Sequence, residues 1–112
     1  MGWNYSNYVK EDVSDKVIHG IVDQFPESWF SSLSKGADAS RQYWGWSTIV
    51  DINIVSHNQP LDWDDLANSE RANVVSIGGA GYSSGHGKVV NDFIVEKLKE
   101  LGYTILKTEF SN

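Results

Sequence analysis

The stretch Tyr43–Val55, YWGWSTIVDINIV, decides which fold this sequence can adopt. β-Branched and aromatic residues fill it and no proline interrupts it, which predicts one continuous β-strand. Its dry face, read at a period of two residues, comprises Trp44, Trp46, Thr48, Val50, Ile52 and Ile54. Burying such large apolar side chains contributes roughly 10 kcal/mol gross, so this strand should lie in the core. The other face carries Ser47, Asp51 and Asn53, which suits a surface open to solvent or to a partner.

The composition limits the class of protein. The chain has 112 residues, which is enough for one core, so we expect a single domain over residues 1–112. Hydrophobic residues make up 40% of the chain and aromatic residues 12%, which excludes a disordered protein. Cysteine is absent, so disulfides and thiolate metal sites are excluded. We expect neither a metal nor a cofactor.

The N-terminal segment predicts no export signal. The residues MGWNYSNYVKEDV contain neither a basic region nor a continuous apolar region, and eighteen consecutive apolar residues occur nowhere in the chain. We therefore expect a cytoplasmic protein with no membrane partner.

Acidic residues dominate the charge. Fifteen Asp and Glu against nine Lys and Arg give a net charge of −6. Between positions 51 and 70 there is no Lys or Arg at all, and the acidic residues there are Asp51, Asp62, Asp64, Asp65 and Glu70. Nucleic-acid binding requires clustered basic residues, so a nucleic-acid partner is excluded and a basic protein is favoured. The same charge is also typical of a small protein that needs only to remain soluble.

Five further elements follow from hydrophobic periodicity. Strands are predicted at Trp3–Val9, Asn73–Ile77 and Tyr103–Phe110, and amphipathic helices at Glu11–Phe25 and Lys88–Leu101. Between the first helix and the principal strand we expect a brief helical turn near Ser28–Leu33 and then a polar loop. The order βαββαβ predicts an α+β two-layer sandwich of the ferredoxin-like kind. About four antiparallel strands would then carry two helices on one face.

The most distinctive local chemistry is the acidic segment Asp62, Trp63, Asp64, Asp65. A calcium loop requires alternating acids, a central glycine and a distal glutamate, and this segment has neither the glycine nor the register. It is either a solvated loop or a displayed patch in which Trp63 supplies apolar contact and the aspartates receive Lys or Arg from a partner. The partner-binding residues that we predict are Asp62, Trp63, Asp64, Asp65, Glu70, Asp51 and Trp29.

A glycine-rich segment, Gly78–Lys88, precedes the second helix. It does not match a phosphate-binding loop, because Tyr82 stands where the first glycine is needed and Val89 stands where the hydroxyl residue is needed. It fails the dinucleotide pattern as well. A flexible loop that leads into a helix can still attract an anion. Its candidate residues are Ser83, Ser84, His86 and Lys88.

Two functions of different classes follow from these patterns. The first is a small acidic inhibitor, such as an immunity protein that neutralises a basic, nuclease-like toxin by masking its surface. The alternative is a small enzyme or anion-binding domain that uses the loop Gly78–Gly87, with His86 as acid or base. The enzyme hypothesis lacks a coherent set of nucleophile, base and orienting residue. An oligomeric scaffold that pairs through its open sheet face is a third option.

Overall fold

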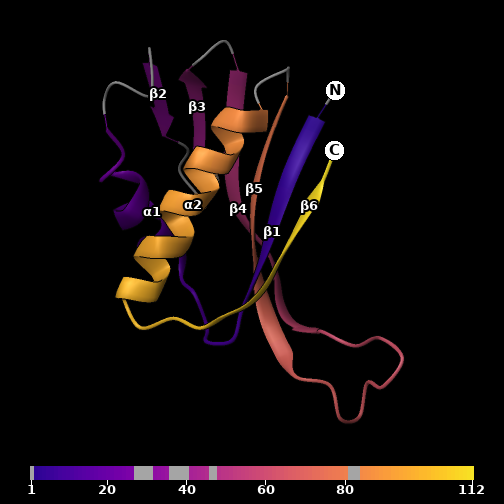
Figure 1. The fold of residues 1–112 in the computed structure, drawn as a ribbon. Helices are drawn as coiled ribbons and strands as arrows, with labels where there is room; N and C mark the ends of the chain where they lie inside the picture. Colours follow the sequence, from indigo (N-terminus) through magenta and orange to yellow (C-terminus); the bar gives the residue numbers. More distant parts are fainter. Residues whose placement is uncertain (1, 27–31, 36–40, 46–47, 81–83) are drawn as a thin grey trace.

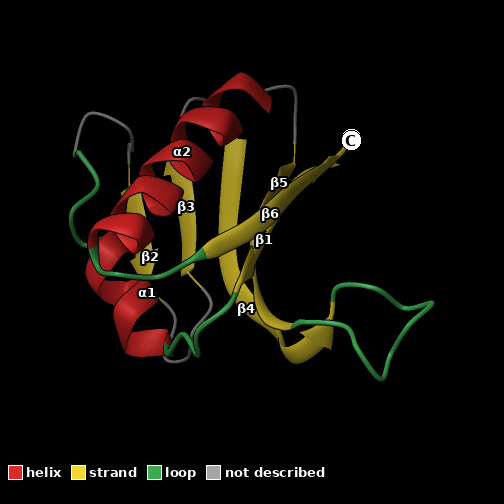
Figure 2. Cartoon of the chain, turned by 60° about the horizontal axis from the view of Figure 1, so that its bottom comes forward, coloured by secondary structure: helices red, strands yellow, loops and turns green. Residues whose placement is uncertain are grey.

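The computed structural model describes residues 2–26, 32–35, 41–45, 48–80 and 84–112. The strands are β1 (Gly2–Val9), β2 (Ser32–Lys35), β3 (Arg41–Gly45), β4 (Thr48–Pro60), β5 (Arg71–Ala80) and β6 (Ile105–Ser111). The helices are α1 (Asp15–Val22) and α2 (Ser84–Glu100), and both lie on the same side of the sheet (Figures 1 and 2). In the described part of the chain, neither helix has the length and apolarity to cross a membrane.

The structure confirms the α+β class, with one antiparallel sheet and two helices. The sheet has six strands in the order β2-β3-β4-β5-β1-β6, where about four were predicted. The predicted βαββαβ order is matched only approximately. The elements β1, α1, β4, β5, α2 and β6 follow it, and β2 with β3 forms an additional hairpin inserted between α1 and β4.

The prediction of one strand over Tyr43–Val55 is wrong. The chain reverses between β3 and β4, and the two strands pair antiparallel with Gly45 opposite Thr48. Trp44 is therefore paired with Ile49, and the period of two does not continue across the reversal. Glycine weakens strand propagation, and a two-residue connection is the shortest common hairpin. Ser32–Lys35 forms β2 rather than part of a helical turn, and residues 28–31 lie outside the described part of the chain.

The main core lies between the sheet and the two helices. Ile52 of β4, Val75 and Ile77 of β5, and Ile94 and Leu98 of α2 have no exposed surface. Helix α1 begins after Ser14, whose side chain accepts a hydrogen bond from Val17 N, as a helix N-cap does. The other buried members are Trp3, Val9, Val13, Ile18, Ile21, Val22, Phe25 and Val90. Most of the periodic apolar residues that predicted both helices thus belong to this core, but Leu101 lies after the end of α2 and is 59% exposed.

A polar cluster crosses this core and fixes α2 against the sheet. Asn7 is fully buried, and its amide nitrogen donates to Asn91 Oδ1 at 2.7 Å. Its amide oxygen accepts from the hydroxyl of Thr108 at 2.8 Å. Buried polar groups are costly unless they are paired, so this cluster favours one register of α2 over β1 and β6.

Two glycines of the segment Gly78–Lys88 have packing roles. A Cβ on Gly87 would lie 2.4 Å from a ring atom of Trp3, and a Cβ on Gly78 would lie 3.0 Å from Asn4 Oδ1. Trp3 is 3% exposed, so its ring has no room to move away. Gly20 of α1 differs, because a Cβ there meets nothing within 4 Å. Gly20 is therefore not a point of close approach between α1 and the sheet.

These two glycines give a matched prediction. Gly87→Ala should lower the free energy of unfolding by about 1 to 3 kcal/mol, because it overpacks a rigid indole. Gly20→Ala should raise it by about 0.5 to 1 kcal/mol, because alanine favours the helix and finds open space. Urea unfolding of both variants measures the difference. Equal effects of the two substitutions would contradict the close packing of α2 on Trp3.

Candidate functional site

The β4–β5 hairpin projects from the body of the protein as an arm. Its two strands continue past the edge of the neighbouring strands, and residues 61–70 close its outer end (Figures 1 and 2). Leu61 at the inner end of this loop packs on a second apolar cluster formed by Tyr8, Ala72 and Val74. This cluster lies on the sheet face opposite the helices, and it anchors the arm to β1.

Hydrogen bonds within the loop hold the outer end of the arm, which we call the arm tip (residues 61–70). The carboxylate of Asp62 accepts from Asp64 N at 2.9 Å, and Asp62 N donates to Ser69 Oγ at 2.8 Å. The carboxylate of Asp65 accepts from the side-chain amide of Asn68 at 3.2 Å, and the backbone carbonyl of Asp65 accepts from Ser69 N at 2.9 Å. These partners are all neutral, so the aspartates keep their net charge. The tip is therefore ordered before any partner arrives, which reduces the entropy lost on binding.

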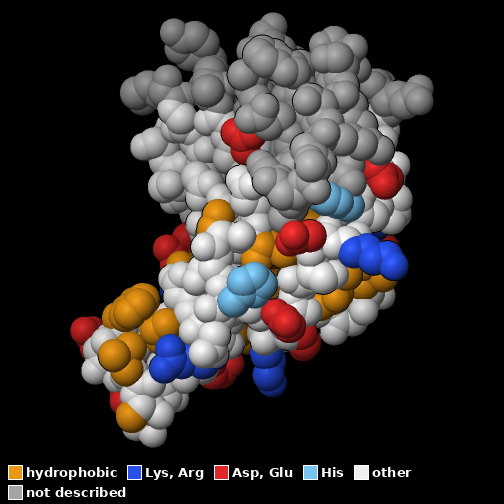
Figure 3. Space-filling model, turned by 180° about the vertical axis from the view of Figure 1, so that it is seen from behind, with side chains coloured by type: hydrophobic (Ala, Val, Ile, Leu, Met, Phe, Trp, Pro, Cys, Tyr) orange, Lys and Arg blue, Asp and Glu red, His pale blue; other side chains and the backbone are white. Residues whose placement is uncertain are grey.

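The arm tip displays apolar and acidic side chains together. Trp63 is 66% exposed and Leu66 is 48% exposed. Asp62, Asp64 and Asp65 are exposed as well, and none of them forms an ion pair with a described Lys or Arg. Apolar side chains are gathered on the arm, seen at the lower left of the space-filling view (Figure 3). An exposed indole beside unpaired carboxylates suits contact with an apolar and cationic surface.

The structure does not bring all the predicted partner-binding residues together. Glu70 is exposed at the end of the tip, but Asp51 lies further along β4, opposite Gly78. One carboxylate oxygen of Asp51 is buried and accepts no hydrogen bond from the described residues. Trp29 falls outside the described residues. The predicted acidic surface is thus confined to the tip, and Asp51 is not part of it.

The predicted anion loop is largely regular structure. Ser84 and His86 are in the first turn of α2, and their side chains lie outside the described part of the protein, as does Ser83. Lys88 is 2.7 Å from Asp92 one turn later, and this hydrogen bond raises the pKa of Lys88. The glycines at 78 and 87 accommodate Asn4 and Trp3. The role of His86 in chemistry stays a prediction.

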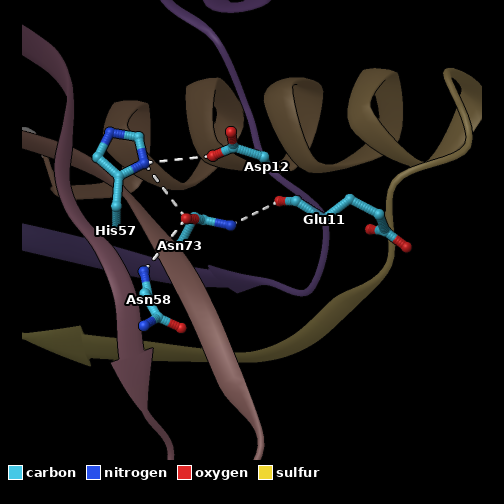
Figure 4. A network of polar contacts seen from close by, with 5 residues as sticks. All are labelled: Glu11, Asp12, His57, Asn58 and Asn73. Atoms are coloured by element: carbon cyan, nitrogen blue, oxygen red, sulfur yellow. Dashed lines mark hydrogen bonds and ion pairs between the residues drawn. The ribbon is translucent and has the colours of Figure 1, made fainter.

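A polar network that the sequence did not reveal lies at the base of the arm (Figure 4). Asn73 of β5 is 7% exposed, and its amide nitrogen donates to the carbonyl of Glu11 at 2.8 Å. Its amide oxygen accepts from Asn58 N at 3.3 Å and lies 3.2 Å from His57 Nδ1. The same Nδ1 is 3.4 Å from a carboxylate oxygen of Asp12. Because both neighbours offer oxygen acceptors, Nδ1 carries the proton.

Glu11 fastens this network to the start of β6. Its carboxylate accepts from Thr104 N at 2.6 Å and from the Thr104 hydroxyl at 2.8 Å. These hydrogen bonds hold the pKa of Glu11 below its ordinary value of 4.5, with the backbone bond as the largest cause. No sequence signal predicted this pairing, because the two residues are 93 positions apart.

Comparison with known proteins supplies no relative. The chain matches no protein-family model, no curated protein and no solved structure. Its function is therefore argued from its own geometry.

The Glu11–Thr104 contact predicts a pH dependence of stability. A carboxyl group with a lowered pKa in the folded state stabilises the fold above its unfolded value of 4.5. That contribution disappears as the pH falls through the folded pKa. Glu11→Gln should therefore be less stable than the native chain at neutral pH, and the difference should shrink below pH 4.5. Urea unfolding over a pH series measures it.

Thr104→Val provides the matched control for this prediction. It removes the hydroxyl donor and keeps the backbone donor, so the pH-dependent effect of Glu11→Gln should be smaller in its background. If the difference in the free energy of unfolding between the native and Glu11→Gln proteins is the same at every pH, the carboxylate charge has no part in the contact.

Proposed function

We propose that this protein binds a basic protein through the arm tip. The observation that carries the proposal is that Trp63, exposed to 66%, stands on an ordered projection among aspartates that no described cation neutralises. A solvent-exposed tryptophan is costly to display, and aromatic residues are the usual anchors of protein interfaces. The surrounding carboxylates supply long-range attraction for a cationic surface.

The partner class that fits best is a basic, nuclease-like toxin, which makes the protein an immunity-type inhibitor. A nuclease surface that holds a phosphate backbone is rich in Lys and Arg, and clustered aspartates can occupy the same positions as phosphates. An inhibitor of this kind benefits from rapid association, which charge provides. The cysteine-free composition and the acidic balance agree with this role in the cytoplasm. The split βαβ core, in this proposal, is a ferredoxin-like scaffold whose extended hairpin has become the binding element.

The charge at the arm tip gives the first test. The native protein is first screened against a panel of basic nuclease domains to find one that it binds. The combined substitution Asp62→Asn, Asp64→Asn and Asp65→Asn should then slow association with that domain. The expected decrease is about 10-fold or more in low salt and should fade as salt rises. Association rates measured by biolayer interferometry at several salt concentrations report it. The melting temperature should stay nearly unchanged, because these side chains are exposed.

A charge-matched control separates local attraction from net charge. Asp15→Asn, Glu96→Gln and Glu100→Gln also remove three negative charges, but from the two helices. This control should change the association rate about twofold at most, since it is the local field that steers encounter. Equal slowing by both sets, or no binding to any basic nuclease domain, would refute the proposed function.

The indole gives an independent test through dissociation. Trp63→Ala should raise the dissociation rate by about 30-fold, which corresponds to a loss of about 2 kcal/mol at an interface anchor. Leu101→Ala is the control, because Leu101 is also exposed, to 59%, but follows α2 on the helical side. If both variants dissociate at the native rate, Trp63 is not an anchor.

A further inference from the structure

A cavity of about 350 Å³ opens where the arm joins the body, and we call it the base cleft. Its walls come from the segment after β1, from β4 and from the start of β5. The lining residues are Lys10, Asp12, His57, Asn58, Arg71, Ala72 and Asn73. Cavities that hold small ligands have volumes of roughly 300 to 1,000 Å³, so the base cleft is large enough for a small molecule.

An irregularity in β4 creates the base cleft. Ile54 pairs with Val75 and Gln59 pairs with Ala72. Between these two pairs β4 advances by five residues and β5 by only three. The extra residues bulge out of the ladder, and Asn58 adopts a positive φ of 58°. Bulges of this kind redirect side chains and occur often beside functional sites. The left-handed conformation of Asn58 is a small local strain that the surrounding contacts must maintain.

Asn73 holds the two walls of the base cleft together. Its side chain is more than nine-tenths buried, and it bonds Glu11 on one wall and Asn58 on the other. Its amide nitrogen donates to one wall and its amide oxygen accepts from the other, so Asn73 positions the site. Figure 4 shows Asn73 between His57, Asn58 and Glu11. The base cleft is thus held by partly buried hydrogen bonds between β5, the bulge of β4 and the segment after β1.

The cations of the base cleft form no ion pair with the described residues, although the charge of Lys10 contributes to lowering the pKa of Glu11. Lys88, Lys97 and Lys107 each pair with a carboxylate. Neither Lys10 nor Arg71 forms an ion pair with a described residue, and Arg71 makes only a long hydrogen bond to Asn58 O at 3.4 Å. The one acid of the lining, Asp12, has a side chain that is 88% exposed, and Lys10 and Arg71 are exposed as well, so solvent screens all three charges and the two cations outnumber the one acid. In a chain of net charge −6, this is a local concentration of positive charge.

We propose that the base cleft binds a small oxyanion, which is a phosphate or a carboxylate group. Lys10 and Arg71 would neutralise its charge, and the guanidinium of Arg71 offers the forked donor geometry that such groups match. His57 Nδ1 is turned toward Asn73 and Asp12, and Nε2 can donate to an oxyanion only when the ring carries protons on both nitrogens. This site adjoins the arm tip, because Arg71 directly follows Glu70, but the exposed charges of the tip are acidic. Its ligand therefore has chemistry opposite to that of the proposed protein partner.

Nuclear magnetic resonance tests this proposal with simple anions. ¹⁵N-labelled protein is titrated with sodium phosphate or sodium acetate, and sodium chloride at matched ionic strength is the reference. The chemical shifts of the backbone amides of His57, Asn58 and Ala72 should change with anion concentration until they reach saturation. Phosphate binding alone identifies a phosphoryl ligand, and acetate binding alone identifies a carboxylate ligand. Binding of both identifies a general oxyanion site, and each of these three results supports the proposal.

Variants locate the anion. Arg71→Gln should weaken binding by about 10-fold, the size expected for one charge-assisted hydrogen bond, and Lys10→Gln should weaken it as well. Lys97→Gln is the control, because Lys97 pairs with Glu100 on α2, away from the lining of the base cleft, and it should change affinity less than about twofold. Thermal unfolding establishes that each variant is folded. If one of the two base-cleft variants does not fold, the other carries the test.

Failure of this proposal is distinguishable from failure of the proposed function. Shifts that do not saturate, or an equal effect of Arg71→Gln and Lys97→Gln, would mean an adventitious ion only and would overturn the proposal. The substitutions of Asp62, Asp64 and Asp65 should leave phosphate and acetate affinity within about twofold, whatever they do to protein binding.

Discussion

The antiparallel ladder between β4 and β5 is the interaction on which the rest of the structure depends. It contains the pair Ile52 and Ile77, both fully buried, at the centre of the core. It also continues to Pro60 and Arg71, beyond the reach of the helices, where it becomes the arm. One hairpin therefore supplies both the apolar surface that α2 covers and the projection that carries Trp63. Loss of its register would affect the fold and the candidate site together, because a slip by one residue exchanges the two faces of a strand.

The two ends of this arm have opposite chemistry. The tip presents aspartates whose hydrogen bonds come from neutral groups of the same loop, so their charge remains available. The base cleft presents Lys10 and Arg71 beside a bulge that Asn73 holds open. Arg71 lies on the last rung of the ladder, opposite Pro60 and directly after Glu70, and Lys10 lies in the segment after β1. The basic and acidic residues thus adjoin without forming an ion pair among the described residues. Salt at physiological concentration also screens exposed charges beyond about 8 Å.

Polar side chains in buried positions decide the details of the assembly. Asn7 joins β1 to α2 and β6, and Asn73 joins β5 to the segment before α1 and to the bulge of β4. Apolar contacts alone would permit small shifts of α2 over the sheet, whereas an unpaired buried amide costs about 1 to 3 kcal/mol. These two asparagines thus convert a loosely specified sandwich into one arrangement. Gly87 also restricts the packing to one arrangement, because the ring of Trp3 occupies the space that a side chain at position 87 would need.

The sequence by itself determined the elements whose signal is local. The hydrophobic periodicity of β1, α1, α2 and β6 predicted these elements, because neighbouring residues already show which face is apolar. The acidic loop was evident from its composition. The sequence could not determine that Tyr43–Val55 divides into two strands, since the alternation of side chains looks continuous on both sides of Gly45. Nor could it reveal the base cleft, whose walls meet through residues 62 positions apart, Glu11 and Asn73. Contacts between distant residues depend on strand register and on where a bulge falls, and only the packed tertiary structure fixes those.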